Sequence, residues 1–98
     1  MDKFAILALL HAKPGKESEV EEFLESAQPL AVQESGTTTW YAVKLGPGRF
    51  GIFDTFPDES SRNAHLNGPI AKALMARAGE LLAEPPQLEM LDILASKA

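Results

Sequence analysis

The segment Phe4–Leu10 (FAILALL) is apolar at every position. Side chains of a β-strand alternate between two faces, so this segment predicts a strand whose two faces both need cover. A chain of 98 residues is long enough for one compact domain, but a domain of this size buries only about 60 to 65% of its unfolded surface. We therefore expect a strand that the chain's own helices cover on one side, with a second copy covering the other.

Helical and strand-like patterns alternate along the rest of the chain. Apolar residues recur at helical spacing from Glu17, and Pro29 predicts a kink or an irregular last turn before Gly36 stops this helix. The runs 37–45 and 49–56 are rich in β-branched and aromatic residues and flank a Gly-Pro-Gly turn, which predicts a hairpin. The first helix should bury the following apolar residues: Val20, Phe23, Leu24, Ala27, Leu30 and Ala31.

Two further helices and a strand complete the predicted order. Asp58 can cap a short helix that stops near Leu66, and Pro69 suits the first turn of the next helix. That helix should bury Ile70, Leu74, Ala78, Leu81 and Leu82. The run 88–94 then gives a last strand, so the order is β-α-β-β-α-α-β. Residues 1–98 thus form one α+β domain, a ferredoxin-like four-stranded antiparallel sheet with helices on one face. Sheet-to-sheet packing of two copies about a two-fold axis would cover the other face.

The charge and the composition exclude several classes of function. A net charge of -5 with scattered cations argues against nucleic acid and anionic membranes as partners. The chain has no cysteine, so disulfides, thiolate chemistry and cysteine-based metal sites are excluded. The apolar run of seven residues is too short to span a membrane. We expect a soluble, cytoplasmic protein.

The chain has two histidines, and one of them is a candidate catalytic base. His65 has an unperturbed pKa near 6.5, so it could accept a proton at neutral pH. At the end of a short helix it could equally stabilise the terminal carbonyls. His11 has no histidine or cysteine at ligand spacing, so we expect a structural or solvated residue and no metal site.

Several segments together resemble the antibiotic biosynthesis monooxygenase domain of the dimeric α+β barrel superfamily. They are AILALLHAKPGKESEVEEFL, SGTTTWYAV, GIFDTFPDESSRNAHLNGPIAKAL and the final strand. The resemblance implies a subunit that forms a dimeric α+β barrel through its sheet. For members that are enzymes, it also implies oxygenation of a small phenol, anthrone or quinol without metal, flavin or haem, so no cofactor is expected. His65 corresponds to the Ala-His position of the family.

The resemblance and the aromatic content together suggest the residues that could contact a substrate. Trp40, Phe53 and Phe56 could form pocket walls, and Asn63 could offer its amide to a substrate oxygen. Trp40 and Tyr41 must point to opposite faces of their strand, and sequence alone does not say which one faces the pocket. Packing in the core or the dimer is the alternative for each aromatic residue.

The chain departs from the family pattern at two positions. Phe56 stands where relatives often carry tryptophan, and Ile70 stands where many carry a second histidine. The first strand has no asparagine, which argues against the haem-degrading branch.

Three hypotheses about function remain from the sequence. The first is a monooxygenase with His65 as base, and the second is a non-catalytic dimeric barrel that binds an apolar small molecule. The third is an isomerase or lyase that uses proton transfer alone.

Overall fold

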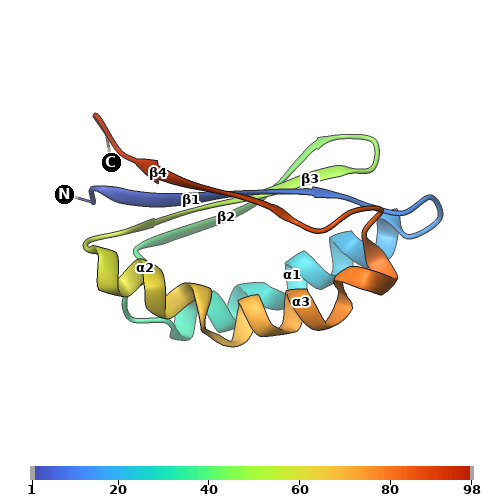
Figure 1. Cartoon of the computed structure of the whole chain (residues 1–98), viewed down its shortest axis with the longest axis horizontal. Coiled ribbons are helices and arrows are strands. Elements are labelled where there is room, and N and C mark those ends of the chain that lie inside the picture. The colour runs from blue at the N-terminus through green and yellow to red at the C-terminus, as the bar shows by residue number, and fades with distance from the viewer. Residues whose placement is uncertain (1, 98) are drawn as a thin grey trace.

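The Phe4–His11 segment is strand β1 and lies inside a four-stranded sheet of order β2-β3-β1-β4. The structure is a computed structural model and describes residues 2–97. All strand pairs are antiparallel, and all three helices lie on one side of the sheet (Figure 1). The other elements are α1 (Glu17–Gln33), β2 (Thr39–Gly46), β3 (Arg49–Phe56), α2 (Glu59–Leu66), α3 (Pro69–Leu81) and β4 (Gln87–Asp92). The predicted order and the ferredoxin-like class are confirmed.

The ends of the helices show how local chemistry sets the boundaries. Asp58 caps α2 as predicted, because its Oδ1 accepts a hydrogen bond of 2.8 Å from the backbone N–H of Ser61. Pro69 occupies the first turn of α3. Pro29 lies inside α1, which continues to Gln33 and so ends before Gly36.

Gly36 has a packing role instead of a capping role. A Cβ atom at this position would lie 2.8 Å from the Cβ and Oγ of Ser61, a distance that real Cβ atoms essentially never show. The missing side chain therefore lets the loop after α1 approach α2 closely.

The core lies between the sheet and the helices. One alternation class of the two central strands faces the helices, and its apolar members are buried. They meet the buried stripe of α1 and that of α3. The buried apolar side chains on the helix-facing side of the strands are Ile6, Ala8, Leu10, Phe50, Ile52 and Phe56, and those from the helices and the α3 end are Val20, Phe23, Leu24, Ala27, Ala31, Ile70, Leu74, Leu81 and Leu82.

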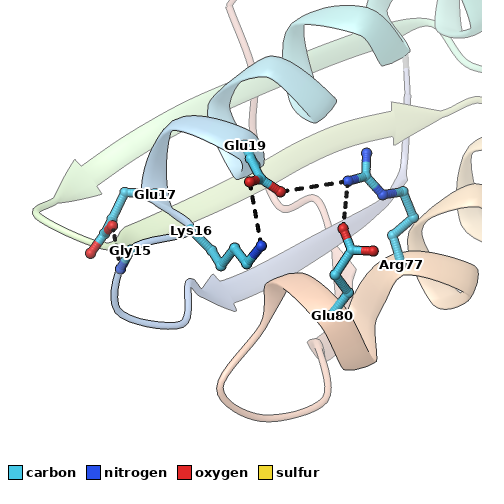
Figure 2. A network of polar contacts seen from close by, with 6 residues as sticks. All are labelled: Gly15, Lys16, Glu17, Glu19, Arg77 and Glu80. Atoms are coloured by element: carbon cyan, nitrogen blue, oxygen red, sulfur yellow. Dashed lines mark hydrogen bonds and ion pairs between the residues drawn. The ribbon is translucent and has the colours of Figure 1, made fainter.

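A network of polar contacts links the start of α1 to the end of α3 at the surface (Figure 2). Arg77 of α3 lies 2.9 Å from Glu80 and 3.9 Å from Glu19 of α1, and Lys16 lies 3.4 Å from Glu19. All these side chains are substantially exposed. Exposed ion pairs contribute little, so the buried apolar stripes hold the two helices together.

The sheet face opposite the helices is open within this chain. It carries Leu7, Leu9, Tyr41, Val43, Leu45 and Phe53, and Tyr41 is 58% exposed. No described element packs over these side chains, as Figure 1 shows for the ribbon. Within residues 2–97, no helix is both long and apolar enough to cross a membrane.

Candidate functional site

The side chain of Asp54 lies in the core between the sheet and the helices. Strand β3 alternates strictly, so Asp54 shares a face with Ile52 and Phe56 and is only 1% exposed. A buried carboxylate is costly unless it is paired and hydrogen-bonded. The structure therefore requires a partner for Asp54 from the helical layer.

His65 of α2 is that partner, and it bridges two carboxylates. Its Nε2 lies 2.9 Å from Asp54 Oδ2, and its Nδ1 lies 2.5 Å from Oε1 of Glu34, which directly follows α1. His65 is 9% exposed. Two ring nitrogens that each face a carboxylate can both donate only when the ring is an imidazolium. We call Glu34, His65 and Asp54 the carboxylate–histidine cluster.

The electrostatics of the cluster favour the charged form of His65. Burial, the largest single effect, would lower the pKa of His65. The hydrogen bonds and negative charges of Asp54 and Glu34 act in the opposite direction and outweigh it, so the pKa is raised above the ordinary 6.5. An imidazolium has no free lone pair. With two carboxylates and one imidazolium, the cluster carries a formal net charge of -1.

Neighbouring residues pack around His65 and Glu34. The ring of Phe56 lies 5.4 Å from that of His65, centroid to centroid. Thr37 Oγ1 donates a hydrogen bond of 2.7 Å to Glu34 Oε1. A Cβ atom on Gly68 would lie 3.3 Å from Glu34 Oε2, so a glycine there leaves room for this carboxylate. Glu34 Oε2 and Asp54 Oδ1 are buried and accept no hydrogen bond from the described residues.

A small hollow lies beside the cluster, between the end of α1 and the start of β2. Its volume is about 240 Å³. It is lined by Gln28, Ala31, Val32, Thr37, Thr38 and Trp40. Thr37 belongs to both the hollow and the hydrogen bonds of the cluster. Trp40 is the register partner of Asp54 across β2 and β3, so it too connects the hollow with the cluster.

The structure brings together three of the five residues that the sequence suggested. His65 and Phe56 are in contact, and Trp40 lies on the same side of the sheet, packed against the core. Tyr41 lies on the open face. Phe53 is its register partner and therefore also lies on the face opposite His65, while Asn63 is exposed on α2. Phe53 and Asn63 share no site with His65 within one chain.

His11 is far from this site. It ends β1 at the opposite end from Phe4, and its Nδ1 lies 2.7 Å from Glu84 Oε1 at the surface. Across the part of the chain that the structure describes, no group of three or more His, Asp or Glu side chains is placed to hold a metal ion.

Sequence reasoning missed Glu34, Thr37 and Asp54. Asp54 carried a usable signal, because it is the one charged residue in the alternation class of Phe50, Ile52 and Phe56. Glu34 and Thr37 carried none, since they lie in a polar loop that only the fold brings to His65.

Comparison with solved structures identifies a close relative. The crystal structure of NE2512 from Nitrosomonas europaea, a protein of unknown function, has 55% sequence identity and a TM-score of 0.98. The match covers 100% of this chain and 95% of that one. A scan of protein-family models and a search of curated proteins found no match.

More distant structures share the fold. Rv0793 from Mycobacterium tuberculosis has 20% identity and a TM-score of 0.86, with 97% of this chain and 98% of that chain covered. A "putative antibiotic biosynthesis monooxygenase" from Nitrosomonas europaea has 15% identity and a TM-score of 0.83, with 94% and 99% covered. The chain therefore belongs to the same family as NE2512 and has the fold of the antibiotic biosynthesis monooxygenase domain.

Proposed function

We propose that this protein is a monooxygenase that oxidises a small electron-rich phenol, quinol or anthrone with molecular oxygen and needs no cofactor. The observation that carries the proposal is the buried carboxylate–histidine cluster, with net charge -1, next to a hollow lined by Trp40. Three structures that share this fold are named "putative antibiotic biosynthesis monooxygenase", which supports the same reaction class.

The reaction can draw its electrons from the substrate. A quinol and one O₂ give a hydroxyquinone and one water. One oxygen atom becomes a hydroxyl substituent of the ring, and electrons from the ring reduce the other oxygen atom to water. The first step is removal of a hydroxyl proton, because the phenolate passes an electron to oxygen far more readily than the phenol does. The protein's task is then to hold the ring and to accept that proton.

The cluster is the proposed proton acceptor. His65 is already protonated between its two carboxylates, so the proton goes to the cluster as a unit and brings its net charge from -1 to zero. In this scheme His65 keeps the two carboxylates in place and is not itself the base that the sequence suggested, and Glu34 is the member that accepts a hydrogen bond from Thr37, which lines the hollow.

The size of the hollow limits the substrate. Sites for drug-sized ligands occupy roughly 300 to 1,000 Å³, whereas this hollow has a volume of about 240 Å³. A single aromatic ring with small substituents suits this space better than a polycyclic anthrone. Phenols and simple quinols are therefore the first substrates to try.

We also propose that two copies pack sheet to sheet as a dimeric α+β barrel. The support is the open face, where Tyr41, Val43 and Leu45 are 58%, 44% and 48% exposed although they are apolar or aromatic. Sedimentation velocity should give a dimer for the wild type, and Val43→Lys should give a monomer. Lys44→Ala, on the other face of the same strand, is the matched control and should remain a dimer.

Oxygen uptake tests the catalytic proposal. Wild type is compared with a no-enzyme control on phenol, hydroquinone and catechol, with chelator present and with flavin absent. Uptake above autoxidation that falls by about 10² to 10⁴-fold in Glu34→Gln supports a proton-accepting cluster. Uptake equal to autoxidation for every compound contradicts the proposal, and product formation without oxygen points to proton-transfer chemistry alone.

One observation favours a second candidate function, the binding of a small apolar molecule without turnover. Both ring nitrogens of His65 are engaged by carboxylates, which is also what a purely structural buried histidine requires. Saturable binding of an aromatic compound with no oxygen uptake would support this candidate.

A further inference from the structure

We infer that the hollow beside Trp40 selects ring compounds that donate a hydrogen bond, because its two threonine hydroxyls offer only acceptors to a ligand. The inference rests on the proposed function and specifies the substrate class of the same site. It predicts that hydroxylated rings bind and that rings of equal size without a donor bind more weakly.

The hydroxyl of Thr37 already donates its only proton within the protein. A hydroxyl has one donor and two acceptor lone pairs. Thr37 Oγ1 donates to Glu34 Oε1 at 2.7 Å, and this bond to a carboxylate is stronger than one to a neutral acceptor. Glu34 is held in turn by His65 at 2.5 Å, so it cannot turn away from Thr37 without breaking the cluster. What Thr37 presents to the hollow is its lone pairs.

The hydroxyl of Thr38 also donates its only proton within the protein. Thr38 Oγ1 donates to Asp2 Oδ1 at 3.0 Å, and the other oxygen of Asp2 accepts a hydrogen bond of 2.7 Å from Thr55. The carboxylate of Asp2 is therefore fixed from two sides. Thr38 also lines the hollow and has only lone pairs left for a ligand.

The remaining lining residues do not reverse this preference. The indole Nε1 of Trp40 is a donor without a hydrogen-bond partner among the described residues, but the atom is buried, with almost no exposed surface. Gln28 is exposed on α1, and its amide can serve as donor or acceptor. No lysine or arginine lines the hollow, and the cluster behind Thr37 carries a net charge of -1. Carboxylates and phenolates should therefore bind less well than a neutral phenol.

The donor requirement fits the first step of the proposed reaction. A ligand hydroxyl that donates to Thr37 is one hydrogen bond away from Glu34, the acceptor in the cluster. Binding through the hydroxyl thus points the proton to be removed at the group that would receive it.

The test compares phenol with fluorobenzene, which has nearly the same shape and no donor. Titration of isotope-labelled protein, followed by NMR without oxygen, gives the dissociation constants and shows whether Trp40, Thr37 and Thr38 shift. The variants are Thr37→Val, Thr38→Val, the double variant and Thr37→Ser. Ser26→Ala is the control, because its hydroxyl donates to the backbone carbonyl of Phe23 and lies outside both the hollow and the hydrogen bonds of Thr37 and Thr38.

The preference for phenol over fluorobenzene should depend on the hydroxyls of Thr37 and Thr38. The dissociation constant of fluorobenzene divided by that of phenol should fall by about three- to tenfold in Thr37→Val, as expected for the loss of one neutral hydrogen bond. It should fall further in the double variant. Thr37→Ser and Ser26→Ala should leave the ratio unchanged.

A ratio that stays the same in both valine variants overturns the inference, and so does binding of both compounds elsewhere or not at all. Because the titration needs no oxygen, an absence of oxygen uptake would reject the proposed function and leave this result standing.

Discussion

Removing the imidazole from the carboxylate–histidine cluster should strongly destabilise the protein. The change His65→Leu keeps an apolar side chain in a place that is 9% exposed and leaves Asp54, 1% exposed, without its only hydrogen-bond donor among the described residues. Glu34 loses its contact of 2.5 Å at the same time. Breaking a buried pair by removing one partner costs about 3 to 5 kcal/mol, because a charge stays buried and uncompensated. We expect this loss in the free energy of unfolding at pH 7.

The assay is urea unfolding followed by far-ultraviolet circular dichroism, at a fixed protein concentration because subunit association would add to stability. The unfolding entropy is about 0.2 kcal/mol/K for a domain of this length, so the same change should lower the melting temperature by roughly 15 to 25 °C.

The control removes the whole cluster. Replacing Glu34, His65 and Asp54 together by leucine should recover most of the stability, since apolar residues of similar volume often replace buried ion pairs at little cost. A single variant that loses less than about 1 kcal/mol, or a triple variant no more stable than the single one, would refute the reasoning.

The remaining predictions concern pH, capping and the surface. The pKa of His65 is raised in the folded state, so its stabilising contribution is complete below pH 6.5 and is lost as the pH rises through the higher folded value. The urea midpoint of wild type, relative to that of His65→Leu, should therefore fall as the pH is raised above 6.5. Asp58→Ala should lower the melting temperature by a few degrees and Asp58→Asn by less, because asparagine can still accept from the N–H of Ser61. Equal losses would mean that the charge of Asp58, and not its hydrogen bond to Ser61, stabilises α2. Arg77→Gln should change the free energy of unfolding by no more than about 0.5 kcal/mol, since Arg77 is 42% exposed, and a loss above 1 kcal/mol would show that the network of Figure 2 is strongly stabilising.

Most of the fold could be predicted because the local sequence signals that begin and end each element agree with the burial that the fold requires. The apolar run at Phe4, the cap at Asp58 and the proline at Pro69 each mark a boundary that the structure confirms. The end of α1 was harder, because Pro29 is tolerated inside the helix and Gly36 lies beyond its last residue. Position 36 requires glycine because Ser61, which is distant in sequence, lies against it in the fold.

The site was only partly predictable, for a physical reason. His65 could be found as a titratable residue, but its two partners come from segments 31 and 11 residues away, which no spacing rule connects. The choice between Trp40 and Tyr41 depended on the register of β2 against β3, and pairing of Trp40 with Asp54 decides it. Phe53 was suggested as a pocket wall by the family resemblance and its aromatic character, whereas its position in the alternation puts it on the open face.

The position of Trp40 gives the protein an internal fluorescent reporter. The chain has one tryptophan, which lines the hollow and is the register partner of Asp54 across β2 and β3. Emission excited at the red edge of the absorption band therefore comes from this one place, with no background from other indoles. A ring that stacks in the hollow and a proton that enters the cluster should both change its quantum yield, but only the second change should follow pH in the absence of ligand. A single fluorescence experiment can thus distinguish ligand binding in the hollow from protonation of the carboxylate–histidine cluster.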